Sequence, residues 1–201
     1  MQPREFLSLL RVAERLKDTT RHCTTSHGRQ ESVAEHSWML TLSVFFLQDA
    51  LREEFPDLDV GKLTEMCLIH DLGEAFTGDI PVFDKTAADE SAEVRLLGSW
   101  VEGLSDPTRA RMQALYQEMS ERVTPEAKIY KALDGMEALI QHNLSPIETW
   151  TDQEYALNMT YTDDRVGFSR VLTALREEIR EDTVHKIRAA GKEVPDGASE
   201  S

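Results

Sequence analysis

The chain has 201 residues, of which 40% are hydrophobic, and its formal net charge at pH 7 is −15. This length suits one domain with a substantial core, and the composition excludes a disordered or a membrane-class protein. The acidic charge argues against binding along a nucleic-acid backbone. It does not argue against a small phosphate ester, because a metal and a few Arg or Lys side chains can reverse the potential inside a pocket.

The N-terminal segment and the cysteines indicate a cytoplasmic protein. The segment MQPREFLSLLRVAERL carries charges throughout and has no signal-peptide cleavage pattern, and no apolar run is long enough to span a bilayer. Cys23 and Cys67 lack C-x-x-C spacing, and a disulfide is not expected in a reducing compartment. The apolar neighbours of Cys67 predict a core thiol, whereas Cys23 has polar neighbours and could lie near a site.

Helical periodicity dominates the first part of the chain. Residues 4–17 place apolar side chains on one stripe, which predicts a helix, and the polar, aperiodic residues 18–31 predict a loop. Ser32 and Glu35 form an S-x-x-E capping box, which predicts the start of a helix that runs to about residue 54 and ends before Phe55-Pro56-Asp57.

The rest of the chain continues in the same way. Periodicity and start signals predict further helices over residues 60–70, 87–104, 107–121, from 125 to beyond 140, 152–158 and 165–190. No β alternation of useful length, no repeat and no internal linker is found. We therefore expect one compact all-α domain over residues 1–190, followed by a tail, 191–201, that lacks core residues and is expected to be disordered.

Two positions on these helices carry unusual chemistry. His70-Asp71 ends an apolar helix, where an Asp opposes the helix dipole and is more plausible with a cation beside it. Asp134 lies between Leu133 and Met136 on or beside an apolar face, where a carboxylate must pair, hydrogen-bond or ligate. A lone His-Asp dipeptide is a weak signal, and Asp134 could simply pair with Lys131.

A third position completes a set of metal-binding groups. His36 lies in the first turn of its helix, where it could equally be a surface or capping histidine. Together with His70, Asp71 and Asp134, it would supply two imidazoles and two carboxylates from three helices. Such a mixed nitrogen and oxygen set suits a divalent transition metal.

The ordered segments ESVAEHSW, IHDLGEAFTGDIP and KALDGMEALIQHN resemble the HD-domain metal-dependent phosphohydrolase superfamily, and within it the branch of the 5′-deoxynucleotidases. The resemblance extends from about Leu9 to Ile187. It implies a multi-helix HD domain in which His36, His70, Asp71 and Asp134 bind one divalent transition metal, which could be manganese, cobalt, iron or nickel.

The resemblance also implies catalytic roles for two acidic residues. Glu74, three residues past Asp71, matches the acid that serves as general base or orients the attacking water. Asp79, in GDIP, matches a second acid near the catalytic centre. The simpler alternatives are a surface acid for Glu74 and an Asx-type turn residue before Ile80-Pro81 for Asp79.

Substrate contacts are expected in the segment before the first metal-binding helix. Arg21 matches a basic residue that contacts substrate in the deoxynucleotidases, where a Trp follows it. Here His22 follows, which puts the preference for deoxyribose in doubt. Arg29 is a second candidate for binding phosphate, or a solvated loop charge, and Lys85 is a weaker one.

The other histidines do not suggest a second metal. His22, His27, His142 and His185 contain no adjacent His-His pair of the kind that two-metal HD enzymes show, so one metal is expected, and His142 is expected to serve a surface or interface.

The resulting hypothesis is an enzyme that hydrolyses a small phosphate monoester, above all a nucleoside 5′-monophosphate, with no nucleic-acid polymer or membrane as partner. A phosphodiesterase, a nucleoside triphosphate hydrolase and a metal-binding regulatory HD module with little turnover remain alternatives. The resemblance further implies a homodimer.

Overall fold

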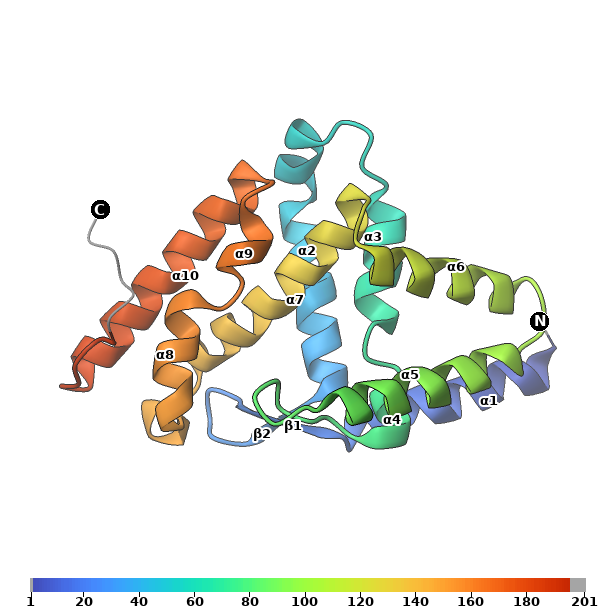
Figure 1. The fold of residues 1–201 in the computed structure, drawn as a ribbon, viewed down its shortest axis with the longest axis horizontal. Coiled ribbons are helices and arrows are strands. Elements are labelled where there is room, and N and C mark those ends of the chain that lie inside the picture. The colour runs from blue at the N-terminus through green and yellow to red at the C-terminus, as the bar shows by residue number, and fades with distance from the viewer. Residues whose placement is uncertain (1, 196–201) are drawn as a thin grey trace.

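Three helices meet at the centre of the molecule and carry most of its core. The structure, a computed structural model, describes residues 2–195. Helix α7 (Pro125–Leu144) crosses α2 (Val33–Glu54) and α3 (Val60–Ile69), as Figure 1 shows. Their facing sides contribute the buried residues Leu40, Val44, Leu51, Leu63, Met66, Leu133, Met136 and Leu139. Burial of these faces fixes the relative positions of the three helices.

The start of α2 is set by the predicted capping box. The Ser32 hydroxyl accepts a hydrogen bond from the Glu35 backbone N–H at 3.3 Å, and the Glu35 carboxylate accepts one from the Ser32 backbone N–H at 2.9 Å. Both free N–H groups at the helix N-terminus are thus satisfied. This cap places His36 in the first turn of α2, with its ring fully buried.

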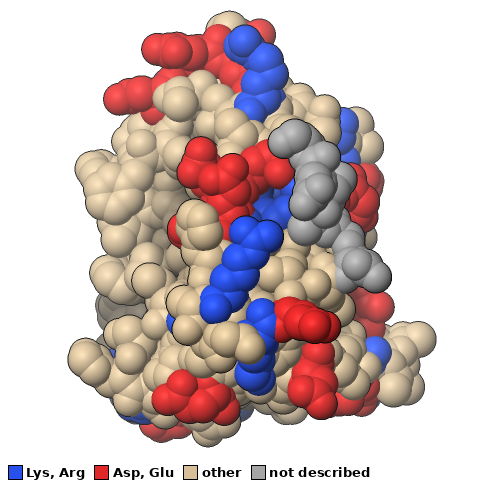
Figure 2. Space-filling view, turned by 90° about the vertical axis from the view of Figure 1, so that its left-hand side faces the viewer, with Lys and Arg blue, Asp and Glu red and all other residues tan. Residues whose placement is uncertain are grey.

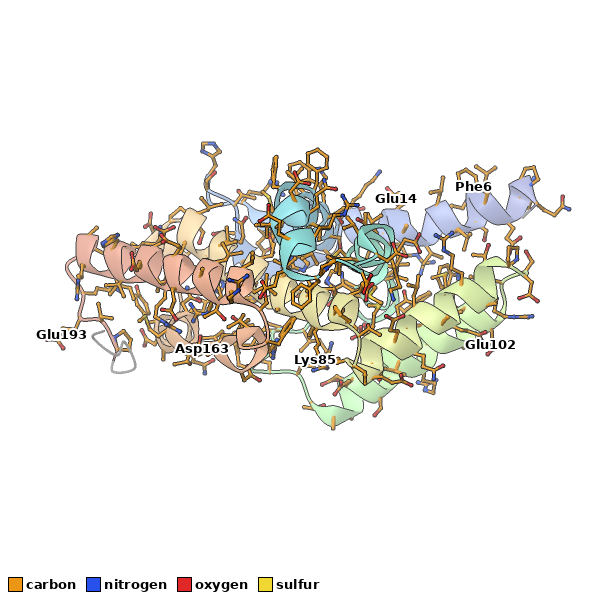
Figure 3. All side chains as sticks on the ribbon, turned by 90° about the horizontal axis from the view of Figure 1, so that it is seen from above. Phe6, Glu14, Lys85, Glu102, Asp163 and Glu193 are labelled. Carbon is orange, nitrogen blue, oxygen red and sulfur yellow. The ribbon has the colours of Figure 1, made fainter. Side chains whose placement is uncertain are left out.

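Helices α1 (Pro3–Ala13), α5 (Ala87–Glu102) and α6 (Thr108–Glu121) form an arm at one end of the molecule, and a short 3₁₀ helix, η1 (Glu14–Lys17), follows α1. Figure 3 shows Phe6 and Glu102 on this arm, away from the crowded centre. The predicted apolar stripe of residues 4–17 is only partly buried: Leu16 lies in the interior, whereas Phe6 and Leu10 are exposed.

The C-terminal part is divided differently from the prediction. The expected single helix over residues 165–190 is wrong, because α9 (Asp163–Val166) and α10 (Arg170–Ala189) are separate helices. Gly167 and Phe168 break the helix, and Ser169 caps α10 by accepting a hydrogen bond from the Leu172 N–H at 3.2 Å. On the face formed by this end of the molecule, acidic and basic side chains are interspersed (Figure 2).

The predicted loop over residues 18–31 is also partly wrong. The segment forms an antiparallel hairpin of β1 (Thr20–Thr24) and β2 (Gln30–Ser32). Each strand is too short to show an alternating pattern, and Gly28, with a φ of +77°, permits the tight turn between them. This hairpin brings Arg21, His22 and Cys23 against α7.

Three short elements complete the described chain: α4 (Glu74–Thr77), η2 (Ile147–Thr149) and α8 (Asp152–Thr160). Beyond α10, the Lys192 ammonium donates to the Tyr155 hydroxyl at 2.5 Å and Val194 packs near Trp150. The remainder of the predicted tail, 196–201, lies outside the described residues. Within residues 2–195, no helix has the length and apolar character needed to cross a membrane.

Candidate active site

The four predicted metal ligands come together from three elements. His36 projects from α2, His70 and Asp71 follow the end of α3, and Asp134 projects from the middle of α7. His70 Nε2 lies 3.0 Å from Asp71 Oδ2 and 3.5 Å from Asp134 Oδ1. His36 Nε2 lies 3.2 Å from His70 Nε2 and 3.2 Å from Asp134 Oδ1, and 3.7 Å from Asp71 Oδ2.

Both imidazoles are held with the same nitrogen facing the centre. His70 Nδ1 donates to the Cys67 carbonyl at 3.0 Å, and His36 Nδ1 donates to the buried Glu137 carboxylate. Because each Nδ1 carries the proton, the lone pair of each neutral ring lies on Nε2. Two Nε2 atoms that face each other cannot satisfy one another, and a shared cation resolves this arrangement.

The surroundings of Asp71 and Asp134 favour the ionised form of both carboxyl groups. Burial alone would raise the pKa of Asp71, but the imidazoles of His70 and His36 outweigh it and lower this pKa. Burial likewise opposes ionisation of Asp134, and Lys131, at 2.8 Å, together with both imidazoles holds the pKa of Asp134 well below its usual range. The donor set is therefore two imidazole nitrogens and two carboxylates.

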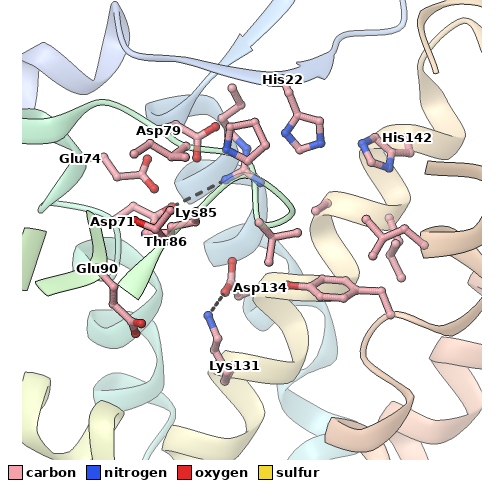
Figure 4. A pocket seen from close by; sticks show the side chains of 18 of the residues that line it. His22, Asp71, Glu74, Asp79, Lys85, Thr86, Glu90, Lys131, Asp134 and His142 are labelled. Atoms are coloured by element: carbon pink, nitrogen blue, oxygen red, sulfur yellow. Dashed lines mark hydrogen bonds and ion pairs between the residues drawn. The ribbon is translucent and has the colours of Figure 1, made fainter. Parts of the chain in front are cut away.

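A cavity of about 430 Å³ opens over this cluster. Its wall includes Asp71, Asp134, Arg21, Glu74, Asp79 and Lys85. Figure 4 shows Glu74, Asp79 and Asp71 on one side of this cavity and His22 and His142 on the other. This volume lies within the range of small-molecule sites, which is about 300–1,000 Å³. The structure thus places both predicted catalytic acids and one predicted substrate-binding arginine at the same cavity.

Glu74 is the most unusual carboxyl in the cavity. It begins the short helix α4, is almost fully buried, and its Oε2 has no hydrogen-bond partner among the described residues. Burial, followed by the nearby charges of Asp71 and Asp79, raises the pKa of Glu74 to about 10. A carboxyl in this setting ionises only when positive charge is placed next to it.

Arg21 lies between two carboxylates. Its Nη1 is 3.7 Å from Asp71 Oδ2, and its Nε is 3.4 Å from the buried Glu31 Oε2. Burial and the neighbouring Glu137 oppose ionisation of Glu31 and Arg21 favours it, and the balance raises the pKa of Glu31 to about 8. Arg21 is therefore a fixed cation at the edge of the cluster.

Arg29 does not line the cavity. Its guanidinium forms two hydrogen bonds with the Glu35 carboxylate, at 3.0 and 2.6 Å, on the exposed side of the hairpin. The structure therefore separates the two arginines that the sequence suggested for phosphate binding.

Sequence reasoning missed two buried carboxylates that contact Arg21 or a predicted ligand, Glu31 and Glu137, whereas the pairing of Asp134 with Lys131 that it considered is present. Glu137 could have been found, because it lies one turn after Asp134 and is flanked by apolar residues. Glu31 gave no such signal, since its burial depends on the hairpin. The prediction that His142 serves a surface or interface was wrong, because His142 is buried.

Comparisons with known proteins agree with this architecture. The family model of the HD domain matches residues 13–176. A 5′-deoxynucleotidase HDDC2 from Dictyostelium discoideum is 28% identical over 142 residues, which cover 68% of this chain and 75% of that protein. A 5′-deoxynucleotidase HDDC2 from Danio rerio is 27% identical over 175 residues, 83% of this chain and 80% of that protein.

A solved structure shows the same fold. A predicted metal-dependent phosphohydrolase from Magnetospirillum magnetotacticum superposes with a TM-score of 0.73 at 24% identity, covering 90% of this chain and 92% of its own. At this level of identity, the likeness shows that the two proteins share a fold.

Proposed function

This chain belongs to the HD-domain family, and on that premise we propose that it is a metal-dependent phosphohydrolase that cleaves nucleoside 5′-monophosphates. The observation that carries the proposal is the convergence of four donor atoms beside a cavity that is lined by Asp71, Asp134 and the unpartnered carboxyl of Glu74. The names of the curated relatives support nucleotides as the substrate class.

The residues present fit one divalent metal. Five separations among the donor atoms of His36, His70, Asp71 and Asp134 lie between 3.0 and 3.7 Å. Ligands about 2.0–2.2 Å from one shared ion lie about 3.0–3.6 Å from each other. When bound there, the metal would supply a Lewis acid that binds a phosphate oxygen and acidifies a water molecule.

Glu74 is proposed as the general base. Positive charge at the four ligands lowers the pKa of its buried carboxyl, and its unpartnered oxygen is then free to accept the proton of the attacking water. The leaving 5′-oxygen is proposed to receive a proton from solvent or from Asp79, which lies on the same cavity wall.

Arg21 is proposed to hold the phosphate. A phosphate monoester carries almost two negative charges near neutral pH, and a guanidinium binds such oxygens with charge-assisted hydrogen bonds. Lys85, which also lines the cavity, replaces Arg29 as the second phosphate-binding cation in this proposal.

Phosphate release from the metal-loaded protein tests the proposal. Nucleoside mono-, di- and triphosphates and a simple phosphodiester are offered separately, and monophosphates should be cleaved to nucleoside and phosphate. Cleavage confined to triphosphates or to the phosphodiester would point to the other enzyme classes, and no turnover of any of them would indicate a regulatory module. Asp71→Asn, which removes one metal ligand, is the control for contaminating phosphatases.

We also propose that the protein is a homodimer. Trp38, Phe45 and Phe46 on the outer side of α2 are each more than half exposed, and such a run of exposed aromatic side chains is typical of an interface. Light scattering after size exclusion should give a molar mass equal to that of two chains. Phe45→Glu should lower the molar mass to that of a single chain. Val94→Glu, which changes an equally exposed apolar residue on α5, should leave the dimer intact.

A further inference from the structure

Four potential metal ligands that the proposed reaction does not use form a second cluster. His22 and Cys23 lie on β1, His142 lies near the end of α7, and Glu154 lies in the first turn of α8. Figure 4 shows His22 and His142 close together, on the side of the cavity that lies opposite Glu74. The cluster therefore ties the hairpin to two helices.

The donor atoms face one another at short range. Cys23 Sγ lies 3.1 Å from His142 Nε2 and 3.7 Å from His22 Nε2. Glu154 Oε1 lies 3.3 Å from each of these two nitrogens. The ligand atoms of His22, Cys23 and His142 thus lie close enough together to hold one ion, and the Glu154 carboxylate contacts both imidazoles.

The cluster is enclosed by protein. Cys23, His142 and Glu154 are each no more than 3% exposed, and His22 is partly buried. A buried thiol, carboxyl and pair of imidazoles are costly unless they pair with one another or bind a cation. Cys23 is too deeply buried to attack a substrate from the cavity, which argues against a catalytic Cys-His pair.

The surrounding contacts orient two of the ligands. His142 Nδ1 donates to the Asn158 side-chain oxygen at 2.8 Å, which leaves the lone pair of the neutral ring on Nε2. Glu154 Oε2 accepts from the Thr151 backbone N–H at 2.5 Å, so that Oε1 remains directed at the cluster. Hydrogen bonds of this kind commonly fix the ligands of a bound metal.

The four contacts are close in length to the separations between neighbouring ligands of tetrahedral zinc. With Zn–N and Zn–O distances of about 2.0–2.1 Å and a Zn–S distance of about 2.3 Å, neighbouring ligands lie about 3.3–3.6 Å apart. The four measured separations span 3.1–3.7 Å. We propose that His22, Cys23, His142 and Glu154 bind one zinc ion, separate from the metal of the proposed active site.

The electrostatics of the cluster agree with this assignment. Burial alone would raise the pKa of Cys23, but hydrogen bonds with His142 and His22 outweigh it and lower this pKa to about 6. The thiolate is the form that binds metals. A zinc ion at this position would balance the charges of the thiolate and the carboxylate.

The function of the site is structural. Four protein ligands leave no position open for substrate, as in zinc sites that stabilise a fold. The ion would fasten β1 to α7 and α8, and β1 carries Arg21 next to Asp71. It would therefore fix the cation that faces the phosphate.

Metal content and cobalt spectroscopy of the purified protein test this proposal. The wild-type protein and Asp71→Asn, which is altered only in the other cluster, should each retain about one zinc per chain after extensive dialysis. Cys23→Ser should lose this zinc. With cobalt(II) in place of zinc, the wild type and Asp71→Asn should show an intense near-ultraviolet thiolate-to-cobalt charge-transfer band, and Cys23→Ser should not.

The wild-type protein is sufficient to refute the proposal if Cys23→Ser does not fold. Absence of the charge-transfer band in fully cobalt-loaded wild type would show that the cluster is an ionic network without metal. Persistence of the band in Cys23→Ser and its loss in Cys67→Ser would likewise overturn the assignment, as would an Asp71→Asn protein that retains no zinc. None of these outcomes depends on whether the protein cleaves nucleotides.

Discussion

Glu137 accepts a hydrogen bond from Nδ1 of His36 across the contact between α7 and α2. Both groups are fully buried, and Glu137 lies one helical turn after Asp134. The same helix therefore supplies one proposed ligand and the group that orients another. This contact determines which nitrogen of His36 faces the cluster, and the first prediction follows from it.

Glu137→Gln should weaken metal binding without abolishing folding. A glutamine side chain can turn its amide toward Nδ1 and so no longer selects one tautomer of His36. Loss of such an orienting carboxylate typically costs about 10- to 100-fold in metal affinity. Competition titration with a chelator measures the affinity. Glu178→Gln, on the exposed side of α10, is the matched control, and equal affinities in the two variants would contradict the prediction.

Glu74→Gln should lower kcat and leave the metal in place. The substitution keeps the shape of the side chain but removes the base, and such a loss costs about 10²–10⁴-fold in rate. Elemental analysis and steady-state kinetics of the same preparation separate the two effects. Glu90→Gln, at the exposed rim of the same cavity, should have little effect on either. A Glu74→Gln protein without metal would instead identify Glu74 as a ligand.

Arg21→Ala and Arg29→Ala should differ sharply. Arg21 faces the cavity beside Asp71, whereas Arg29 is held by Glu35 outside it. Loss of a charge-assisted contact with phosphate costs about 1.5–3 kcal/mol, or roughly 10- to 150-fold in kcat/KM. Arg29→Ala should retain wild-type kinetics. Equal losses of kcat/KM in both variants would contradict this prediction. They would show that Arg29 also contacts the substrate, in a hairpin conformation different from the one described.

The sugar preference should be weaker than in the deoxynucleotidases that the sequence resembles. His22 stands where those proteins have a Trp that helps to position the nucleoside. The ratio of kcat/KM for paired deoxyribo- and ribonucleoside 5′-monophosphates measures this preference. A strong preference for the deoxy substrates would show that other residues of the cavity discriminate between deoxyribose and ribose.

The capping box should give a stability increment that depends on pH. The hydrogen bond from Arg29, together with those from Ser32, outweighs the effect of burial and lowers the pKa of Glu35 from its ordinary 4.5 to about 2. A carboxyl with a lowered pKa stabilises the folded state above pH 4.5 and loses this contribution as the pH falls through about 2.

Glu35→Gln isolates this increment, since glutamine preserves the capping box but not the charge. The difference in melting temperature between wild type and Glu35→Gln should be largest above pH 4.5 and shrink toward pH 2. Because the ion pair is largely exposed, the difference should also decrease with salt. Glu178→Gln should show no such trend.

The sequence was sufficient to predict most helices and the convergence of the four ligands. Capping signals and apolar periodicity are local, and the start of α2 at Ser32 needs nothing beyond residues 32–35. A carboxylate on an apolar helix face, such as Asp134, can also be recognised from the sequence. Once the helix packs, this carboxylate is buried and needs a partner.

Features that depend on distant contacts could not be predicted in this way. The hairpin of residues 20–32 has no alternating pattern, and its strands are stabilised by pairing with each other and by packing against α7. The cluster around Cys23 is a further example, since His22 and Cys23 are more than 100 residues away from His142 and Glu154 in the sequence and meet them only when the hairpin has formed. The break before α10 depends on Ser169, whose hydroxyl also donates to Glu54 at 2.9 Å.

The spacing of residues along α7 has a consequence for how this chain can change in length. Eight positions separate Asp134 from His142, and a single inserted residue between them would turn every later side chain by about 100° and displace it by about 1.5 Å. An insertion before Glu137 would move both Glu137 and His142 away from their partners, and an insertion after Glu137 would move His142. Relatives of this protein should therefore keep the length of this stretch constant, whereas residues 25–29 at the hairpin tip are open to insertions and deletions.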